Sequence, residues 1–209
     1  MTAPQQAQIH RVLRQDAVHV AAVAHVLADA FIDDPSFVFI APDRERRRAL
    51  LPAFFACQVA ADLRRGSATL AIDGARPVGA ALWLPPGVRP PLLRPPQQAL
   101  AMVRALRGGT ARGLRVDLAM VRHLPGGEDF WYLHYLGVAG DSQGRGVGRL
   151  LLADGLARAD AEARPCWLET QLPQNVALYR SVGFEVVAEY DVPGDGPHFW
   201  GMWRPARRR

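Results

Sequence analysis

Residues 131–153 read WYLHYLGVAGDSQGRGVGRLLLA and carry the strongest structural signal in the chain. Aromatic and aliphatic residues come first, a short polar break follows, and a glycine-dense turn leads into leucines, which predicts a strand, a loop and the start of a helix. Gly144, Gly146 and Gly148 are spaced by single residues. Glycines let the backbone approach a ligand closely, and the unpaired N–H groups of a first helical turn attract anions. The pattern therefore indicates a phosphate-binding turn.

Two common phosphate-binding motifs do not fit this turn. A P-loop ends in lysine followed by serine or threonine, and the chain contains no lysine, which argues against a nucleoside triphosphatase. A dinucleotide-binding fold places G-x-G-x-x-G near the start of a strand–helix–strand unit, with an acidic residue about 20 residues further on. The order of the elements here is wrong for that fold.

The turn instead resembles the acetyl-CoA signature of the GNAT superfamily of N-acetyltransferases, Q/R-x-x-G-x-G/A, through Gln143, Gly146 and Gly148. Neighbouring pieces match in the superfamily's order and spacing. These pieces are Leu136-Gly137-Val138, Leu168-Glu169-Thr170, Asn175-Val176-Ala177-Leu178-Tyr179 and Gly183-Phe184. The resemblance covers residues 131–204, and the first half of the chain matches more loosely.

The resemblance implies an α/β (α+β) GNAT fold, with a central, twisted, mixed and mostly antiparallel sheet of about six to seven strands flanked by helices on both faces. With 209 residues we expect a single domain, 1–209. Residues 85–127 are rich in proline and then helical in pattern, and they resemble the helical insertion of a branch similar to puromycin N-acetyltransferase. We expect this insertion to shape the acceptor site or the contact of a homodimer. Residues 205–209 form a basic tail that we expect to be solvated.

Composition and charge bear on partners and location. The net charge is +5 and the pI is near 10, but lysine is absent and alanine and proline are abundant, so we attribute the charge to biased composition and expect no nucleic-acid partner. Cys57 and Cys166 lie far apart and suggest buried thiols, with neither a disulfide framework nor a metal site. Residues 1–8 lack the apolar core of a signal peptide, and no apolar run reaches the ~18 residues of a membrane span. We therefore expect a cytoplasmic protein with no membrane partner.

The first part of the chain predicts a strand and two helices. The strand covers residues 9–13, and the first helix covers 17–31 with Asp16 as its cap. That helix is expected to stop near Asp33-Asp34-Pro35, because proline disfavours helical geometry in the residue before it. A second helix is predicted over residues 44–63.

The rest of the chain predicts mostly short elements. Residues 85–96 are expected to form a stiff proline-rich connector. The other predictions are a hairpin of strands 69–72 and 78–84, helical segments around 100–106 and 114–121, a helix from Gly148 toward Ala163, a strand over 166–170, a short helix over 175–181 and a final strand pair over 184–190 and 198–203.

The resemblance assigns acetyl-CoA, the acetyl donor, to the glycine turn and the strand before it. Glycine amides would bind the pyrophosphate, with added charge from Arg145 or Arg149, and the Val138 N–H would face the thioester oxygen. The predicted donor-binding residues are Leu136, Gly137, Val138, Gln143, Gly144, Arg145, Gly146, Val147, Gly148, Arg149, Asn175 and Tyr179.

Tyr179 is the predicted general acid. By resemblance, a tyrosine at this place lies near the CoA sulfur, where its phenol can protonate the leaving thiolate. Two candidates remain open for the general base. His134 shares a strand face with the donor-binding residues, and imidazole titrates near neutral pH, while Glu169 lies near the end of the next strand. His198 is a third and weaker candidate.

In GNAT proteins the loop after the first helix commonly walls the acceptor pocket. By this resemblance Asp34 is predicted to attract a cationic amine and Phe37 to supply apolar surface. The structural alternative is that one aspartate of Asp33-Asp34 ends the helix and the other is solvated.

The predicted function is direct transfer of an acetyl group from acetyl-CoA to a primary amine of a small molecule, such as an antibiotic or a metabolite. Protein or peptide N-acetylation is the near alternative. A non-catalytic CoA-binding regulatory module is the alternative from another class, against which the glycine turn and Tyr179 both argue.

Overall fold

The structure, a computed structural model, describes residues 7–90 and 96–207. Within these residues a seven-stranded sheet has the order β1-β2-β3-β4-β5-β7-β6, with β4 and β5 the parallel pair and every other neighbouring pair antiparallel. The strands are β1 Gln8–Val12, β2 Ser67–Asp73, β3 Arg76–Leu84, β4 Trp131–Val138, β5 Cys166–Thr170, β6 Glu185–Asp191 and β7 His198–Arg204. The predicted mixed, mostly antiparallel sheet is confirmed.

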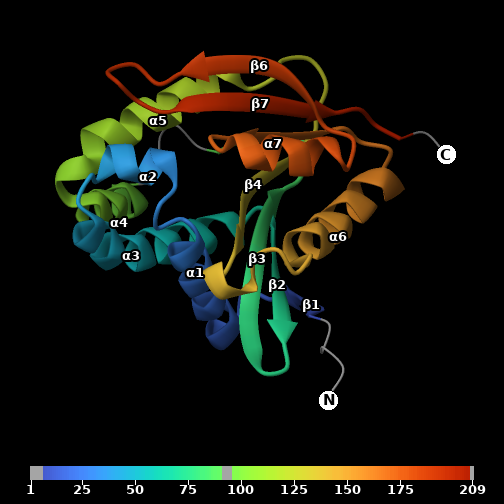
Figure 1. Cartoon of the computed structure of the whole chain (residues 1–209), viewed down its shortest axis with the longest axis horizontal. Helices are drawn as coiled ribbons and strands as arrows, with labels where there is room; N and C mark the ends of the chain where they lie inside the picture. Colours follow the sequence, from blue (N-terminus) through green and yellow to red (C-terminus); the bar gives the residue numbers. More distant parts are fainter. Residues whose placement is uncertain (1–6, 91–95, 208–209) are drawn as a thin grey trace.

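Helices cover both faces of this sheet. They are α1 Ala17–Ala30, α2 Pro35–Ile40, α3 Arg44–Asp62, α4 Pro96–Leu106, α5 Thr110–His123, α6 Val147–Ala161 and α7 Pro173–Arg180, with short 3-10 turns η1 Arg107–Gly109 and η2 Gly140–Ser142. Figure 1 shows α1 and α6 on opposite sides of β3, and β6 and β7 crossing above β2 and β3 at a steep angle, so the sheet is strongly twisted.

The alternation of side chains along β3 separates two cores. Ala80 and Leu82 belong to the core that α1 and α3 cover, whereas Ala81 and Trp83 belong to the core that α6 covers. Gly137 on β4 allows α1 to approach the sheet, because a Cβ at this position would lie 2.7 Å from the Cβ of Ala30. Close packing of α1 thus fixes one wall beside the end of β4.

Strands β4 and β5 pair only over part of their length. Their register joins Trp131–Leu133 with Cys166–Leu168, while residues 135–138 remain paired with β3 alone and His134 lies at a register shift of the β3–β4 pairing. The two strands therefore diverge toward their carboxyl ends, and one edge of the second half of β4 is left without a strand neighbour.

Most predicted elements are found, but three details are wrong. The predicted loop after α1 contains α2, because Asp34 accepts a hydrogen bond from the Ser36 N–H and Pro35 takes the first helical position. Helix α6 ends at Ala161, since Ala163 has a left-handed φ of 49°. The predicted connector over residues 85–96 gives way to helix at Pro96. Residues 91–95, within that connector, and residues 208–209 of the predicted tail lie outside the described residues.

Candidate functional site

A cavity of about 1090 Å³ lies where β4 and β5 diverge. It is lined by β4, the glycine turn, the end of β5 and α7, and by residues of α1 to α5. The predicted site residues that it brings together are Asp34, Phe37, His134, Leu136, Gly137, Val138, Gln143, Gly144, Gly146, Val147, Gly148, Arg149, Glu169, Asn175 and Tyr179. The arrangement joins a strand edge, a helix start and several titratable groups in one space.

The glycine turn has the geometry of an anion site. Gly144 and Gly146 have φ of 74° and 83°, a left-handed conformation that favours glycine, and a Cβ on either would meet nothing within 4 Å. Backbone conformation rather than crowding thus accounts for both glycines. Helix α6 begins at Val147 without a side-chain cap, so the N–H groups of its first turn have no intrahelical acceptor. These residues fit a diphosphate such as that of CoA.

The free edge of β4 presents backbone groups to the same cavity. The Ala139 N–H donates to the Val78 carbonyl on the β3 side, at 2.9 Å. Because successive residues of a strand direct their N–H groups to opposite edges, the Val138 N–H points to the edge that β5 leaves uncovered. The Gln143 side-chain amide donates to the Val138 carbonyl at 3.3 Å, which ties the turn to this edge.

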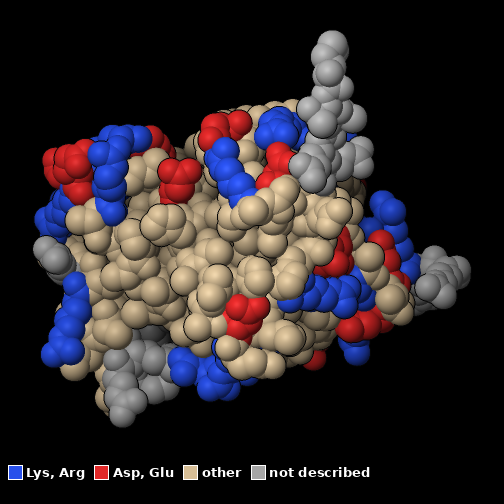
Figure 2. Space-filling view, turned by 90° about the horizontal axis from the view of Figure 1, so that it is seen from below, with Lys and Arg blue, Asp and Glu red and all other residues tan. Residues whose placement is uncertain are grey.

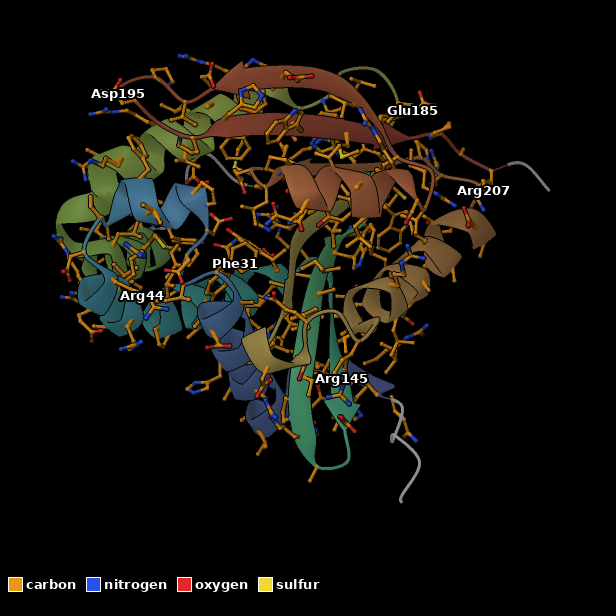
Figure 3. The ribbon with its side chains drawn as sticks, in the orientation of Figure 1. Phe31, Arg44, Arg145, Glu185, Asp195 and Arg207 are labelled. Carbon is orange, nitrogen blue, oxygen red and sulfur yellow. The ribbon has the colours of Figure 1, made fainter. Side chains whose placement is uncertain are left out.

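The two arginines of the turn lie differently. Arg149 lines the cavity, whereas Arg145 does not and instead donates to Asp73 at 2.9 Å. Figure 3 shows Arg145 beside the lower ends of β2 and β3. The structure therefore brings Arg149, and not Arg145, to the predicted donor site.

Tyr179 reaches the cavity from α7. It is buried, and burial raises the pKa of its phenol above the ordinary value, so the hydroxyl stays protonated at neutral pH. No hydrogen bond joins this hydroxyl to another described residue. Asn175, one turn earlier on α7, donates to the Thr170 hydroxyl at 3.4 Å.

The two candidate bases have different surroundings. Glu169 accepts hydrogen bonds from the hydroxyls of Tyr132, at 2.6 Å, and Tyr190, at 3.2 Å, and burial raises its pKa to about 7. His134 has its Nδ1 atom 2.7 Å from a carboxylate oxygen of Asp62 at the end of α3. His198 does not line the cavity and pairs with exposed acidic groups on β6.

The acceptor end of the cavity is formed by α2 and its neighbours. Asp34 is 6% exposed, caps α2, and burial raises the pKa of its carboxyl to about 6. Phe37 is buried beside it. Asp33 is exposed and pairs with Arg44 and Arg47, so only Asp33 is the solvated aspartate of the structural alternative, whereas Asp34 is buried at the start of α2. The hydroxyl of Ser36 is buried, lines the cavity and has no partner among the described residues.

Asp62 and Ser36 were not predicted as site residues. A sequence signal for Asp62 exists, since it follows Phe55 and Val59 on the apolar stripe of α3, where an acidic residue needs a partner. No comparable signal marks Ser36, because its exposure to the cavity depends on where α2 lies.

Three further observations concern metal, membrane and charge. Among the described residues, His10, Asp16 and His19 form a group whose ligand atoms lie close together, and none of them lines the cavity. No described helix combines the length and apolar character needed to cross a membrane. On the face seen in Figure 2, arginine and acidic side chains are interspersed around a broad uncharged area rather than gathered into one basic patch.

The fold and the cavity define an acyltransferase of known architecture. The model of the Acetyltransferase (GNAT) family matches residues 28–184, well over half of the chain, so the protein belongs to this family and is an acetyltransferase. An uncharacterized N-acetyltransferase of Schizosaccharomyces pombe is 26% identical over 189 residues, covering 82% of this chain and 72% of that protein.

Two solved structures show the same fold. A Corynebacterium glutamicum protein described as histone acetyltransferase HPA2 and related acetyltransferase has a TM-score of 0.73 and 24% identity, over 98% of both chains. The ribosomal-protein-S18-alanine N-acetyltransferase of Escherichia coli has a TM-score of 0.57 and 14% identity, over 97% of this chain and 96% of its own.

Proposed function

We propose that the protein transfers the acetyl group of acetyl-CoA directly to a primary amine of a small molecule. The observation that carries this proposal is that the free edge of β4, the first turn of α6 and Tyr179 all line one cavity. A donor diphosphate on the α6 amides would place its thioester arm along β4. The Val138 N–H would then stabilise the charge that develops on the thioester oxygen, which is worth roughly 3 kcal/mol for one oriented donor in other enzymes.

Tyr179 is proposed as the general acid. Its hydroxyl is protonated at neutral pH and unpaired among the described residues, so it is free to give its proton to the leaving thiolate. Retention of this tyrosine together with the glycine turn speaks against a module that only binds CoA.

The acceptor amine must be deprotonated before it attacks. His134 and Glu169 both line the cavity, but both oxygens of Glu169 already accept tyrosine hydroxyls. We therefore assign the base to His134. Asp34 and the unpaired hydroxyl of Ser36 are proposed to recognise the amine end of the acceptor.

The cavity wall supports a small acceptor over a protein. Helices α4 and α5 contribute Met102, Leu106, Val116 and Met120 to the lining, beside Phe37 of α2. These side chains offer an apolar surface of the size of one organic ligand. We propose that the segment 85–127, which contains both helices, is a family insertion that encloses the acceptor. A peptide acceptor would instead need an open groove.

A panel of amines incubated with acetyl-CoA, with release of free CoA thiol as the readout, tests the proposal. Alkyl and aryl primary amines are compared with peptides that carry a free N-terminus or a lysine side chain. CoA release with a small amine is expected. Turnover of peptides alone would reassign the acceptor class, and binding of CoA without any acetyl transfer would favour the regulatory module.

A further inference from the structure

A buried carboxylate lies behind the proposed base. Asp62, the last residue of α3, is 5% exposed, and its Oδ2 atom lies 2.7 Å from Nδ1 of His134. Its other oxygen accepts a hydrogen bond from the Gln58 amide at 3.4 Å. His134 lines the cavity, whereas Asp62 does not. The carboxylate therefore contacts the cavity only through the imidazole.

This contact fixes which ring nitrogen carries the proton. The Gln58 amide nitrogen also lies near Nδ1, but at 3.5 Å it is much farther than the carboxylate oxygen at 2.7 Å, and a carboxylate accepts hydrogen bonds, so Nδ1 of His134 is the donor. In the neutral ring the lone pair then lies on Nε2, which has no hydrogen-bond partner among the described residues. Only a lone pair on Nε2 can take a proton from a ligand.

We infer that Asp62 is a positioning residue that holds His134 in the tautomer and orientation in which Nε2 deprotonates the acceptor amine. The acceptor ammonium gives one proton to Nε2, and the neutral amine then forms the N–C bond as the C–S bond breaks. The thiolate takes the Tyr179 proton. The acylated nitrogen loses its second proton to solvent, which also receives the proton from His134 and returns one to Tyr179, so the net reaction releases one proton.

Other charged or titratable groups also face His134. Glu169 approaches from β5, and Tyr132 and Tyr135 pack against the ring along β4, with ring centroids 5.3 Å and 4.4 Å away. Glu169 accepts hydrogen bonds from two tyrosine hydroxyls and, among the described residues, makes no hydrogen bond to the imidazole. Among the described residues, Asp62 is the acid bonded to this histidine.

Because this inference rests on the proposed function, the first test needs no turnover. Nitrogen-15 NMR of the wild-type protein labelled at histidine reports the protonation of each ring nitrogen, with the His134 resonance assigned from its loss in His134→Ala. In the neutral ring we expect a protonated Nδ1 and an unprotonated Nε2, and an altered tautomer ratio in Asp62→Asn. A wild-type His134 protonated at Nε2 alone would overturn the inference, even if no acceptor amine had been found.

The second test is a double-mutant cycle with the acceptor that the amine panel identifies. Asp62→Asn is expected to lower kcat about 100-fold, as loss of a general base does. In the His134→Ala background the same substitution should change kcat less than about twofold. Equal losses in both backgrounds would show that Asp62 does not act through His134.

Asp191→Asn is the matched control. Asp191 lies 2.8 Å from Nδ1 of His198 in an exposed pair outside the cavity, so this variant loses the same kind of contact and should keep wild-type kcat. Calorimetric binding of CoA to each variant checks that the donor site is intact. Loss of activity in Asp191→Asn equal to that in Asp62→Asn would overturn the positioning role.

Discussion

Replacement of Tyr179 by phenylalanine separates chemistry from folding. The Tyr179 hydroxyl makes no hydrogen bond to another described residue, so its removal leaves no buried group unpaired. The free energy of unfolding should change by less than about 0.5 kcal/mol. Loss of the general acid should lower kcat about 100-fold, equivalent to about 2.7 kcal/mol of transition-state stabilisation.

On the same preparation, steady-state CoA release measures kcat, urea unfolding measures the free energy of unfolding, and calorimetry measures the affinity for CoA, which should stay unchanged. Tyr190→Phe is the contrasting variant, because its hydroxyl donates to Glu169 at 3.2 Å. It should lose about 1.5 kcal/mol of stability while kcat stays within roughly tenfold. Wild-type turnover in Tyr179→Phe would remove Tyr179 from the mechanism, and a large loss of CoA affinity would assign it to donor binding.

Other variants test charge, pH and packing. Arg149→Ala should weaken CoA binding about three- to tenfold, whereas Arg145→Ala should leave it within about twofold, as calorimetry would show. Burial raises the pKa of Glu169 from 4.5 to about 7, so the unfolded chain ionises first and stability is lost as pH rises through this window. As pH rises between these two pKa values, the free energy of unfolding of the wild type should fall by up to about 3 kcal/mol relative to that of Glu169→Gln. If the difference between the two proteins does not change with pH, the burial of the Glu169 carboxyl is contradicted. In Gly155→Ala the new Cβ would lie 2.2 Å from a tryptophan ring on β3, which should cost about 1–3 kcal/mol in urea unfolding, while Gly126→Ala should change stability by less than about 0.5 kcal/mol.

Local features of the sequence were sufficient for much of the fold and for the donor side of the site. The strand, glycine turn and helix over residues 131–153 form as predicted, because each depends on neighbours within a few residues. Asp16 caps α1 as predicted for the same reason, accepting a hydrogen bond from the His19 N–H. The family match places these elements in a known architecture.

Features created by tertiary contact were not predictable in the same way. Asp62 and His134 are 72 residues apart, and only the packing of α3 beside β4 joins them. The choice between Arg145 and Arg149 depends on Asp73, which lies on another strand. Helix α2 was not predicted, because an Asp-Pro pair such as Asp34-Pro35 is found both after the end of one helix and at the start of the next.

The central claim is that the first turn of α6 holds the diphosphate of CoA while the free edge of β4 holds its thioester arm. Titration calorimetry with CoA and with pantetheine, which lacks the diphosphate and the adenosine 3′-phosphate attached to it, tests this claim. CoA should bind at least about 100-fold more tightly than pantetheine, because charged hydrogen bonds to the turn are lost with the diphosphate. Equal affinities for the two compounds, or no affinity for CoA in the folded protein, would contradict the claim.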